Sequence, residues 1–290
     1  MKNYEHDELF HEKLDNYISE FFKSDEGRQA LSRYESRDQK GLPAVGSFVE
    51  DAHFALDLIY PYLKKSEPIL EVGGGACLLA RFLNFEGYNI TVIDPADDFF
   101  SALSDIAFVD SQRFRMPTII QKDVTECGLL DQEAFSVIFS LNVLEHVPNI
   151  YEALAGLKNS LAVKGVMIHC CPNYTVPYEP HIGSFVFPLF RERSVRNKAN
   201  ILFGRDSEGF LNFITYSDVV SIARELDLES SFRQGMLYHA CKRALFQSEF
   251  SSRHRGIVKW IRFLEKHKFL SLLRYIPARF STPMVFTLKR

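Results

Sequence analysis

Two kinds of hydrophobic pattern divide the chain near residue 62. Before that point, apolar residues recur every three or four positions over 9–22 and again over 48–59, which is typical of amphipathic helices. From residue 67, short apolar runs alternate with amphipathic segments. The runs predicted to be strands are Ile69–Val72, Asn89–Ile93, Thr118–Gln121, Phe135–Ser140 and Val166–Cys170. The helices predicted between them lie near Leu78–Asn84, Phe99–Phe108 and Ile150–Leu161.

Nearly continuous apolar strands, each separated by a helix, are what a parallel sheet covered on both faces requires. We therefore predict an α/β fold with a doubly wound sheet, whose ligand crevice lies at the carboxyl ends of the strands. Residues 1–62 are expected to form a helical cap, either a lid or a cover for one sheet edge. Residues 63–290 are expected to form the sheet domain.

The second half of the sheet domain carries two predicted insertions. The first, about 172–215, is irregular and rich in aromatic residues and prolines, and a helix at Tyr216–Leu226 follows it with Thr215 as its N-cap. Ser230–Tyr238 and Met284–Leu288 are predicted to be two further strands. The second insertion, about 241–280, lies between these strands.

The first predicted strand ends in an acidic residue and a glycine-rich turn, Glu71 followed by Gly73, Gly74 and Gly75. Glycines let the backbone turn sharply and approach a ligand, and the next helix offers free N–H groups to an anion. The turn does not fit the dinucleotide pattern G-x-G-x-x-G, because Leu78 stands where the third glycine belongs. A nearby Glu repels a pyrophosphate, whereas it suits a ligand with a cationic amino or sulfonium group.

Acidic and polar residues follow the next three strands as well. Asp94, 19 positions after Gly75, is placed to accept hydrogen bonds from ribose hydroxyls, or else to begin a helix. Asp123 is placed to accept from an adenine amino group, or else to cap the next turn. Asn142 is expected to face the crevice. His146 is a candidate general base because imidazole titrates near neutrality, although packing or capping explains it equally well.

The runs EVGGGA, VIDP, KDV and LNVLEHVPN, in this order within residues 65–172, resemble the class I S-adenosylmethionine (SAM)-dependent methyltransferases. The resemblance is closest to the subgroup that includes the ubiquinone-pathway O-methyltransferases. It implies a seven-stranded sheet with an antiparallel last strand. It also implies the following SAM contacts: Glu71, Gly73, Gly74 and Gly75 around the methionine part, Asp94 at the ribose, Asp123 and Val124 at the adenine, and Asn142 near the methyl group. The family often has Gly where this chain has Cys77, and we expect a tight fit there.

The loop after the fifth strand, CCPNYTVPYEPHIG (Cys170–Gly183), is expected to lie beside the methyl acceptor in this fold. It is similar to a segment of methyltransferases from bacterial surface-glycan and sugar pathways. The residues predicted to bind the acceptor are Asn173, Tyr174 and Tyr178. Glu179 and His181 are predicted to deprotonate an acceptor hydroxyl together, with His146 as the second candidate base. A rigid surface loop with incidental polar groups is the alternative.

The insertion at 241–280 has ten Lys or Arg residues against two Glu, a net charge of +8, with apolar residues interspersed at helical spacing. Such a helix can lie on an anionic membrane, dock on the protein with its basic face in water, or bind a phosphate-bearing substrate. The whole chain carries a net charge of −3, which argues against nucleic-acid binding. The five cysteines and nine histidines show no metal-ligand spacing, so we expect reduced thiols, no metal and a cytoplasmic location.

These observations predict a SAM-dependent methyltransferase that acts on an oxygen, or in second place a nitrogen, of a small molecule. A sugar, a nucleotide-sugar or a surface-glycan precursor is the expected acceptor. Two alternatives remain from the residues: an NAD(P)-linked oxidoreductase on a similar sheet, and a catalytically inactive methyltransferase-like binding protein.

Overall fold

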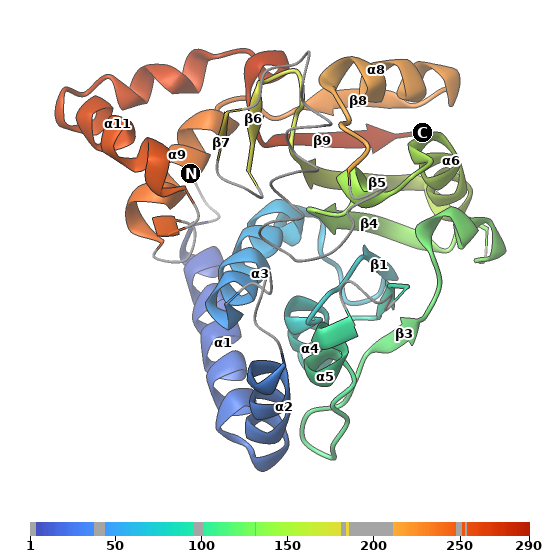
Figure 1. Cartoon of the computed structure of the whole chain (residues 1–290). Coiled ribbons are helices and arrows are strands. Elements are labelled where there is room, and N and C mark those ends of the chain that lie inside the picture. The colour runs from blue at the N-terminus through green and yellow to red at the C-terminus, as the bar shows by residue number, and fades with distance from the viewer. Residues whose placement is uncertain are drawn as a thin grey trace. The chain divides into compact units, whose positions relative to one another are not determined.

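The computed structural model describes residues 4–37, 44–95, 101–130, 132–180, 184–185, 211–247, 251–252 and 254–290 (Figure 1). The chain divides into two compact units. Unit 1 consists of residues 1–141, 151–168 and 290, and unit 2 consists of residues 142–150 and 169–289.

In the described residues of both units, strands pair into one seven-stranded sheet in the order β3-β2-β1-β4-β5-β9-β8. The strands are β1 (Ile69–Val72), β2 (Ile90–Ile93), β3 (Thr118–Ile120), β4 (Phe135–Leu141), β5 (Leu161–Cys171), β8 (Glu229–Phe232) and β9 (Met284–Lys289). The pairs β1–β2, β1–β4 and β2–β3 are parallel, and β8–β9 is antiparallel. The predicted doubly wound α/β fold with an antiparallel last strand is thus confirmed.

The N-terminal helices of unit 1 pack on the first helix of the sheet region. These elements are α1 (Tyr4–Lys23), α2 (Asp25–Ser36), α3 (Val45–Ile59), η1 (Tyr60–Tyr62) and α4 (Leu78–Phe85). Phe82 of α4 lies between two rings of α1, with its ring centroid 5.0 Å from that of Phe10 and 5.9 Å from that of Tyr17. Because these aromatic residues fill the interior of unit 1, they stabilise the fold through apolar burial.

The remaining elements of unit 1 connect its strands. They are η2 (Ser101–Leu103), α5 (Ser104–Ala107), η3 (Val124–Leu129) and α6 (Ile150–Ser160), of which Ile150 falls in unit 2. The buried Arg81 of α4 donates hydrogen bonds to the backbone carbonyls of Ala107, Val109 and Phe114. A buried guanidinium needs such acceptors, so Arg81 anchors the turn that follows α5.

The largest difference between unit 2 and the sequence prediction lies at the end of one strand. Its elements besides the strands above are η4 (Leu144–His146), β6 (Tyr178–Glu179), β7 (Ser184–Phe185), α8 (Tyr216–Glu225), α9 (Met236–Phe246), α11 (Arg255–Lys266), η6 (Leu270–Tyr275) and η7 (Ala278–Phe280). The predicted strand Ser230–Tyr238 is wrong beyond Phe232, because Gly235 adopts φ +79° and begins helix α9. Thr215 caps α8 as predicted, within a capping box with Asp218.

Candidate active site

The glycine turn of unit 1 has no room for side chains. Gly73 and Gly75 have φ values of +70° and +53°, in the left-handed region that favours glycine. A Cβ on Gly74 would lie 2.6 Å from Val92 Cγ1 and 2.8 Å from Cys77 Sγ, closer than atoms approach. Each of the three positions therefore requires glycine, and the backbone of the turn stays accessible to a ligand.

Cys77 lies at the N-cap of α4 with φ +53° and is buried. This left-handed backbone favours Gly, the residue that the resemblance leads us to expect here, since a side chain in this conformation costs about 1–2 kcal/mol. Burial raises the pKa of the Cys77 thiol well above its usual range. The negative charges of the neighbouring Glu71 and Asp94 raise it further, by a smaller amount. Cys77 is therefore a neutral packing residue and not a thiolate nucleophile.

Glu71 is a buried carboxyl group near the end of β1. Within the described residues its Oε2 atom has no hydrogen-bond partner. Burial raises the pKa of Glu71 to about 8, and the charge of Asp94 contributes in the same direction. A buried carboxyl without a partner is unfavourable in the free protein, and a cationic group bound beside it would remove that cost.

Asp94 connects the ends of two parallel strands. Asp94 follows β2 directly, and β2 pairs with β1 up to the pair Val72–Ile93. The Oδ2 atom of Asp94 accepts a hydrogen bond of 3.0 Å from the backbone N–H of Gly75, in the turn after β1. Asp94 thus fixes the glycine turn. The helix that the alternative interpretation requires would begin in 96–100, outside the described residues.

A recess in unit 1 lies next to these residues. Besides Gly75, Cys77 and Asp94, its lining is mainly apolar, and it includes Leu103, Phe108 and Ile119. Sequence reasoning missed these three residues, because their only signal was membership of ordinary hydrophobic patterns. An apolar lining beside a carboxylate suits a nucleoside, whose base packs and whose sugar donates hydrogen bonds.

Asp123 caps the 3₁₀ turn η3. Its Oδ1 accepts hydrogen bonds from the Thr125 backbone N–H at 2.8 Å and from the Thr125 hydroxyl at 2.6 Å. The capping alternative is therefore present in the structure, and both of these bonds use one carboxylate oxygen. Val124 is buried beside it. The adenine contact of Asp123 and Val124 stays a prediction.

In unit 2, the turn after β4 is held by backbone geometry and by Asn212. Asn142 has an exposed side chain and φ +55°, and its N–H donates to the Cys170 carbonyl at 2.8 Å. Asn212, which sequence reasoning missed, donates to the carbonyls of Leu144 and Val147 at 2.6 and 2.7 Å. These bonds fix the backbone on both sides of the pair Glu145–His146.

Glu145 and His146 form an acid–imidazole pair in this turn. Glu145 is fully buried, and its Oε1 lies 3.9 Å from Nε2 of the partly buried His146. This distance is too long for a hydrogen bond but short enough for an electrostatic interaction. Burial raises the pKa of the Cys171 thiol, and the Glu145 carboxyl group is the second cause of this rise. His146 thus lies beside a buried carboxyl group.

Asn173 is a structural residue of the loop after β5. Its Nδ2 donates to the carbonyls of Arg279 and Ser281 at 3.0 Å each, and its Oδ1 accepts from the backbone N–H groups of Thr175 and Tyr216 at 3.1 Å each. An amide side chain has two donors and two acceptor positions, and all four are occupied. The amide of Asn173 is therefore fully hydrogen-bonded within unit 2, and its contact with an acceptor molecule stays a prediction.

The tyrosines of this loop are buried with acid and imidazole partners. Burial, and next the charge of the nearby Glu179, raise the pKa of Tyr174 above its usual range. The Tyr178 hydroxyl lies 2.6 Å from Nδ1 of the buried His254. Sequence reasoning missed His254, which is 76 residues away in the chain. His181, the first candidate base, lies outside the described residues.

The described residues contain no group of three or more His, Cys, Asp or Glu side chains that could hold a metal ion. All five cysteines are unpaired and buried, as expected for reduced thiols.

Comparisons with known proteins agree on one family. A family model described as a methyltransferase domain matches residues 70–167. An uncharacterized protein of Mycobacterium tuberculosis is 32% identical over 240 residues, covering 79% of this chain and 81% of that protein. The ubiquinone biosynthesis O-methyltransferase of Rickettsia bellii is 28% identical over 107 residues, 37% of this chain and 42% of that enzyme. A SAM-dependent methyltransferase structure from Mesorhizobium loti has a TM-score of 0.50 at 13% identity, covering 82% of this chain and 98% of that one, which shows the same fold.

The chain belongs to the class I SAM-dependent methyltransferases. It is an enzyme of that class with SAM as its cofactor, which favours this interpretation over an NAD(P)-linked oxidoreductase. The residues of unit 1 fit this cofactor in two respects. Within the described residues the Oε2 of Glu71 has no partner, which suits the cationic amino group of the methionine part, and the left-handed glycines at 73 and 75 keep side chains off the turn.

Proposed function

We propose that this enzyme transfers the methyl group of SAM to an oxygen, or in second place a nitrogen, of a small molecule. A sugar, a nucleotide-sugar or a surface-glycan precursor is the proposed acceptor class. The similarity to an O-methyltransferase over 107 residues supports oxygen. The acid, tyrosine and imidazole groups buried in unit 2 support an acceptor that forms hydrogen bonds.

The single observation that carries the cofactor assignment is the buried, partnerless Oε2 of Glu71. We assign Glu71 to the amino group of SAM, Asp94 to the ribose hydroxyls, and Asp123 with Val124 to the adenine. Gly73, Gly74, Gly75 and Asn142 complete the proposed cofactor contacts. When bound, SAM supplies an electrophilic methyl group on its sulfonium, so the protein mainly aligns the acceptor, excludes water and removes a proton.

An oxygen acceptor needs a base, and we propose His181 first and His146 second. Glu179 would orient His181, with Tyr174 and Tyr178 binding the acceptor. The 3.9 Å contact with Glu145 supports His146, because a carboxylate stabilises the imidazolium that forms when the base takes a proton. Measuring kcat against pH for His181→Ala and His146→Ala separates them. The variant that lacks the catalytic base should have a lower kcat, and its kcat should no longer rise with pH near neutrality. Unchanged pH profiles in both variants would exclude a histidine base.

We also propose that the basic 241–280 segment contacts an anionic partner, either a membrane surface or a phosphate group. Its net charge of +8 in a chain of net charge −3 supports this.

The test of the proposed function is calorimetric titration of the purified protein with SAM, S-adenosylhomocysteine and NADH, followed by labelled-methyl transfer to a panel of sugars, nucleotide-sugars and phenols. We expect binding of the first two ligands, none of NADH, and label in a hydroxyl-bearing acceptor. Labelling of amines in place of hydroxyls would overturn oxygen as the acceptor atom.

A further inference from the structure

Helix α11 of unit 2 uses one of its faces to join a small apolar core. Val258 and Ile261 are buried, and they pack with α9 and η6. The members of this core are Cys241, Ala244, Val258, Ile261 and Leu270, with the partly buried Leu237, Tyr238, Leu245, Ile257, Leu264 and Leu273 against it. The sequence allowed three interpretations of the basic insertion, and one of them was docking on the protein. The structure shows such docking, and it explains why this face of α11 is apolar.

A second face of α11 is cationic. Arg255, Lys259, Arg262 and Lys266 are all exposed. They follow one another at intervals of four, three and four residues, which places them in one line along an α-helix. The acidic residue of this helix, Glu265, lies off that line and pairs with Lys242 at 2.9 Å.

A third face of α11 exposes aromatic rings. Trp260 is 71% exposed, and Phe263, one turn further along, is also exposed. Phe263 has its ring centroid 4.5 Å from that of His267, whose ring lies 6.5 Å from Phe269. The exposed aromatic surface therefore continues past the end of the helix.

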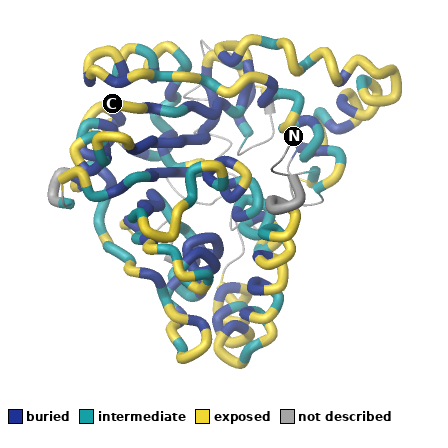
Figure 2. Tube along the Cα trace, turned by 180° about the vertical axis from the view of Figure 1, so that it is seen from behind, coloured by how far each residue is buried: buried dark blue, intermediate teal, exposed yellow. Residues whose placement is uncertain are grey.

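The 3₁₀ helix η6 extends this surface. Residues three apart lie on one line of a 3₁₀ helix. Phe269, Leu272 and Tyr275 have this spacing, and all are exposed, Tyr275 to 80%. We call Trp260, Phe263, Phe269, Leu272 and Tyr275 the apolar ridge. Figure 2 shows exposed residues along this end of unit 2. The described residues contain twelve exposed large hydrophobic side chains, and five of them form this ridge.

The charge around the apolar ridge is almost entirely positive. Residues 254–280 contain seven Lys or Arg residues and one carboxylate, a net +6. Five large apolar side chains exposed on consecutive helices are unusual on a soluble domain unless something covers them, and the surrounding cations favour an anionic partner.

We propose that the apolar ridge inserts into the interface of an anionic phospholipid bilayer, with the cationic line of α11 on the lipid headgroups. This inference rests on the anionic contact proposed above and not on the choice of methyl acceptor. Trp and Tyr favour the headgroup level, and Lys and Arg extend toward phosphates. In the described residues no helix is long and apolar enough to cross a membrane, so the contact is peripheral.

A lipid surface explains the features that a phosphate-bearing substrate leaves unexplained. A free phosphate needs a few converging cations and no exposed apolar side chains. The ridge instead presents five large apolar side chains beside a line of cations, the arrangement of an interfacial helix.

Trp260 is the single tryptophan of the chain, so its fluorescence reports directly on the ridge. The full-length protein is mixed with vesicles of phosphatidylcholine containing 30% phosphatidylglycerol, or with vesicles of phosphatidylcholine alone. We expect a blue shift of Trp260 emission, protection from acrylamide and co-sedimentation with the anionic vesicles, all reduced in 0.5 M salt. Phosphatidylcholine alone should give none of these.

Two variants separate the contributions of apolar and charged residues. Phe263→Ser with Leu272→Ser should weaken vesicle binding about tenfold or more. Lys259→Glu with Arg262→Glu should weaken it in anionic vesicles by a similar factor. The matched control is Leu9→Ser with Tyr151→Ser, two exposed apolar residues of unit 1 far from the ridge in the sequence, which should bind as the wild type does. Unchanged melting temperatures show that the variants fold.

The proposal is overturned by three results: no binding to anionic vesicles in low salt, binding that the Phe263 and Leu272 variant retains, or a Trp260 shift that follows protein concentration or added RNA without vesicles. The last result assigns the ridge to a second copy or to nucleic acid. SAM titration of the same samples distinguishes failure of this inference from failure of the proposed function, because SAM binding requires no vesicles.

Discussion

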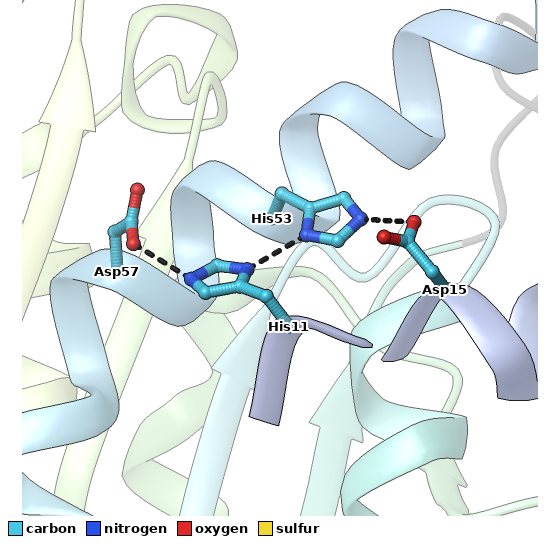
Figure 3. A network of polar contacts seen from close by, with 4 residues as sticks. All are labelled: His11, Asp15, His53 and Asp57. Carbon is cyan, nitrogen blue, oxygen red and sulfur yellow. Dashed lines mark hydrogen bonds and ion pairs between the residues drawn. The ribbon is translucent and has the colours of Figure 1, made fainter. Parts of the chain in front are cut away.

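Nδ1 of His11 lies 2.7 Å from Nδ1 of His53, which joins helix α1 to helix α3 in unit 1 (Figure 3). The other ring nitrogens face carboxylates, His11 Nε2 at 2.8 Å from Asp57 and His53 Nε2 at 2.8 Å from Asp15. The two rings are stacked, with centroids 5.0 Å apart. Because His11 and Asp15 belong to α1 and His53 and Asp57 belong to α3, these contacts link the two helices through both rings and both carboxylates.

This hydrogen-bonded chain predicts that the histidine pair stabilises the connection between α1 and α3. We expect His53→Gln to lower the free energy of unfolding by about 1 kcal/mol, because the substitution disturbs the hydrogen bonds to His11 and Asp15. Thermal unfolding of both proteins measures the difference, with Glu12→Gln on α1 as control. Equal stability of His53→Gln and the wild type would contradict the prediction.

Glu71→Gln should stabilise the free protein while it abolishes cofactor binding. Since burial raises the folded-state pKa of Glu71 to about 8, the wild type loses stability as pH rises from about 4.5 to 8. The neutral amide avoids this loss, and we expect a melting temperature about 5 °C or more higher at pH 8. SAM should stabilise the wild type and leave the variant unchanged. A variant that melts lower at pH 8 would show that the Glu71 carboxylate is satisfied in the free protein.

SAM binding should release a proton. Below pH 8 Glu71 is protonated in the free protein, and a cationic amino group beside it favours the carboxylate. Affinity should therefore rise close to tenfold per pH unit between pH 6 and 7.5. Calorimetry in two buffers of different ionisation enthalpy counts the protons, and Asp94→Asn lowers affinity without removing the release. Buffer-independent enthalpies would rule out Glu71 as the titrating group.

Asn173→Asp should destabilise unit 2 strongly. The substitution replaces two N–H donors with an oxygen that faces the carbonyls of Arg279 and Ser281. Leaving two buried carbonyls unsatisfied costs about 1–3 kcal/mol each, and the buried charge adds to this. Chemical denaturation should show a loss of about 3 kcal/mol or more, while Thr175→Ala, an exposed neighbour, changes stability by less than about 0.5 kcal/mol. Similar stability of the two variants would assign Asn173 to substrate binding instead.

The sequence by itself determined the fold class and the first five strands along the chain. Buried parallel strands are largely apolar, and β1 and β2 are followed directly by turns that contain Gly or Asp, so the hydrophobic pattern and the motifs agree. It also placed the residues of the glycine turn, because Glu71 to Gly75 are contiguous and their chemistry is local. The sequence did not show that the strand ends before Gly235, because that boundary depends on one backbone angle. A short apolar run fits a strand as well as a buried helix face.

Tertiary structure decided the roles of residues whose partners are distant in the chain. Asn173 has the polar side chain expected of a substrate contact. Both N–H groups of this side chain, however, donate to the carbonyls of Arg279 and Ser281, more than 100 residues away in the chain. His254 and Asn212 acquire partners in the same way, across 76 and 68 residues. The apolar ridge likewise depended on which face of α11 packs against α9, since helical periodicity identifies faces but not which one the protein buries.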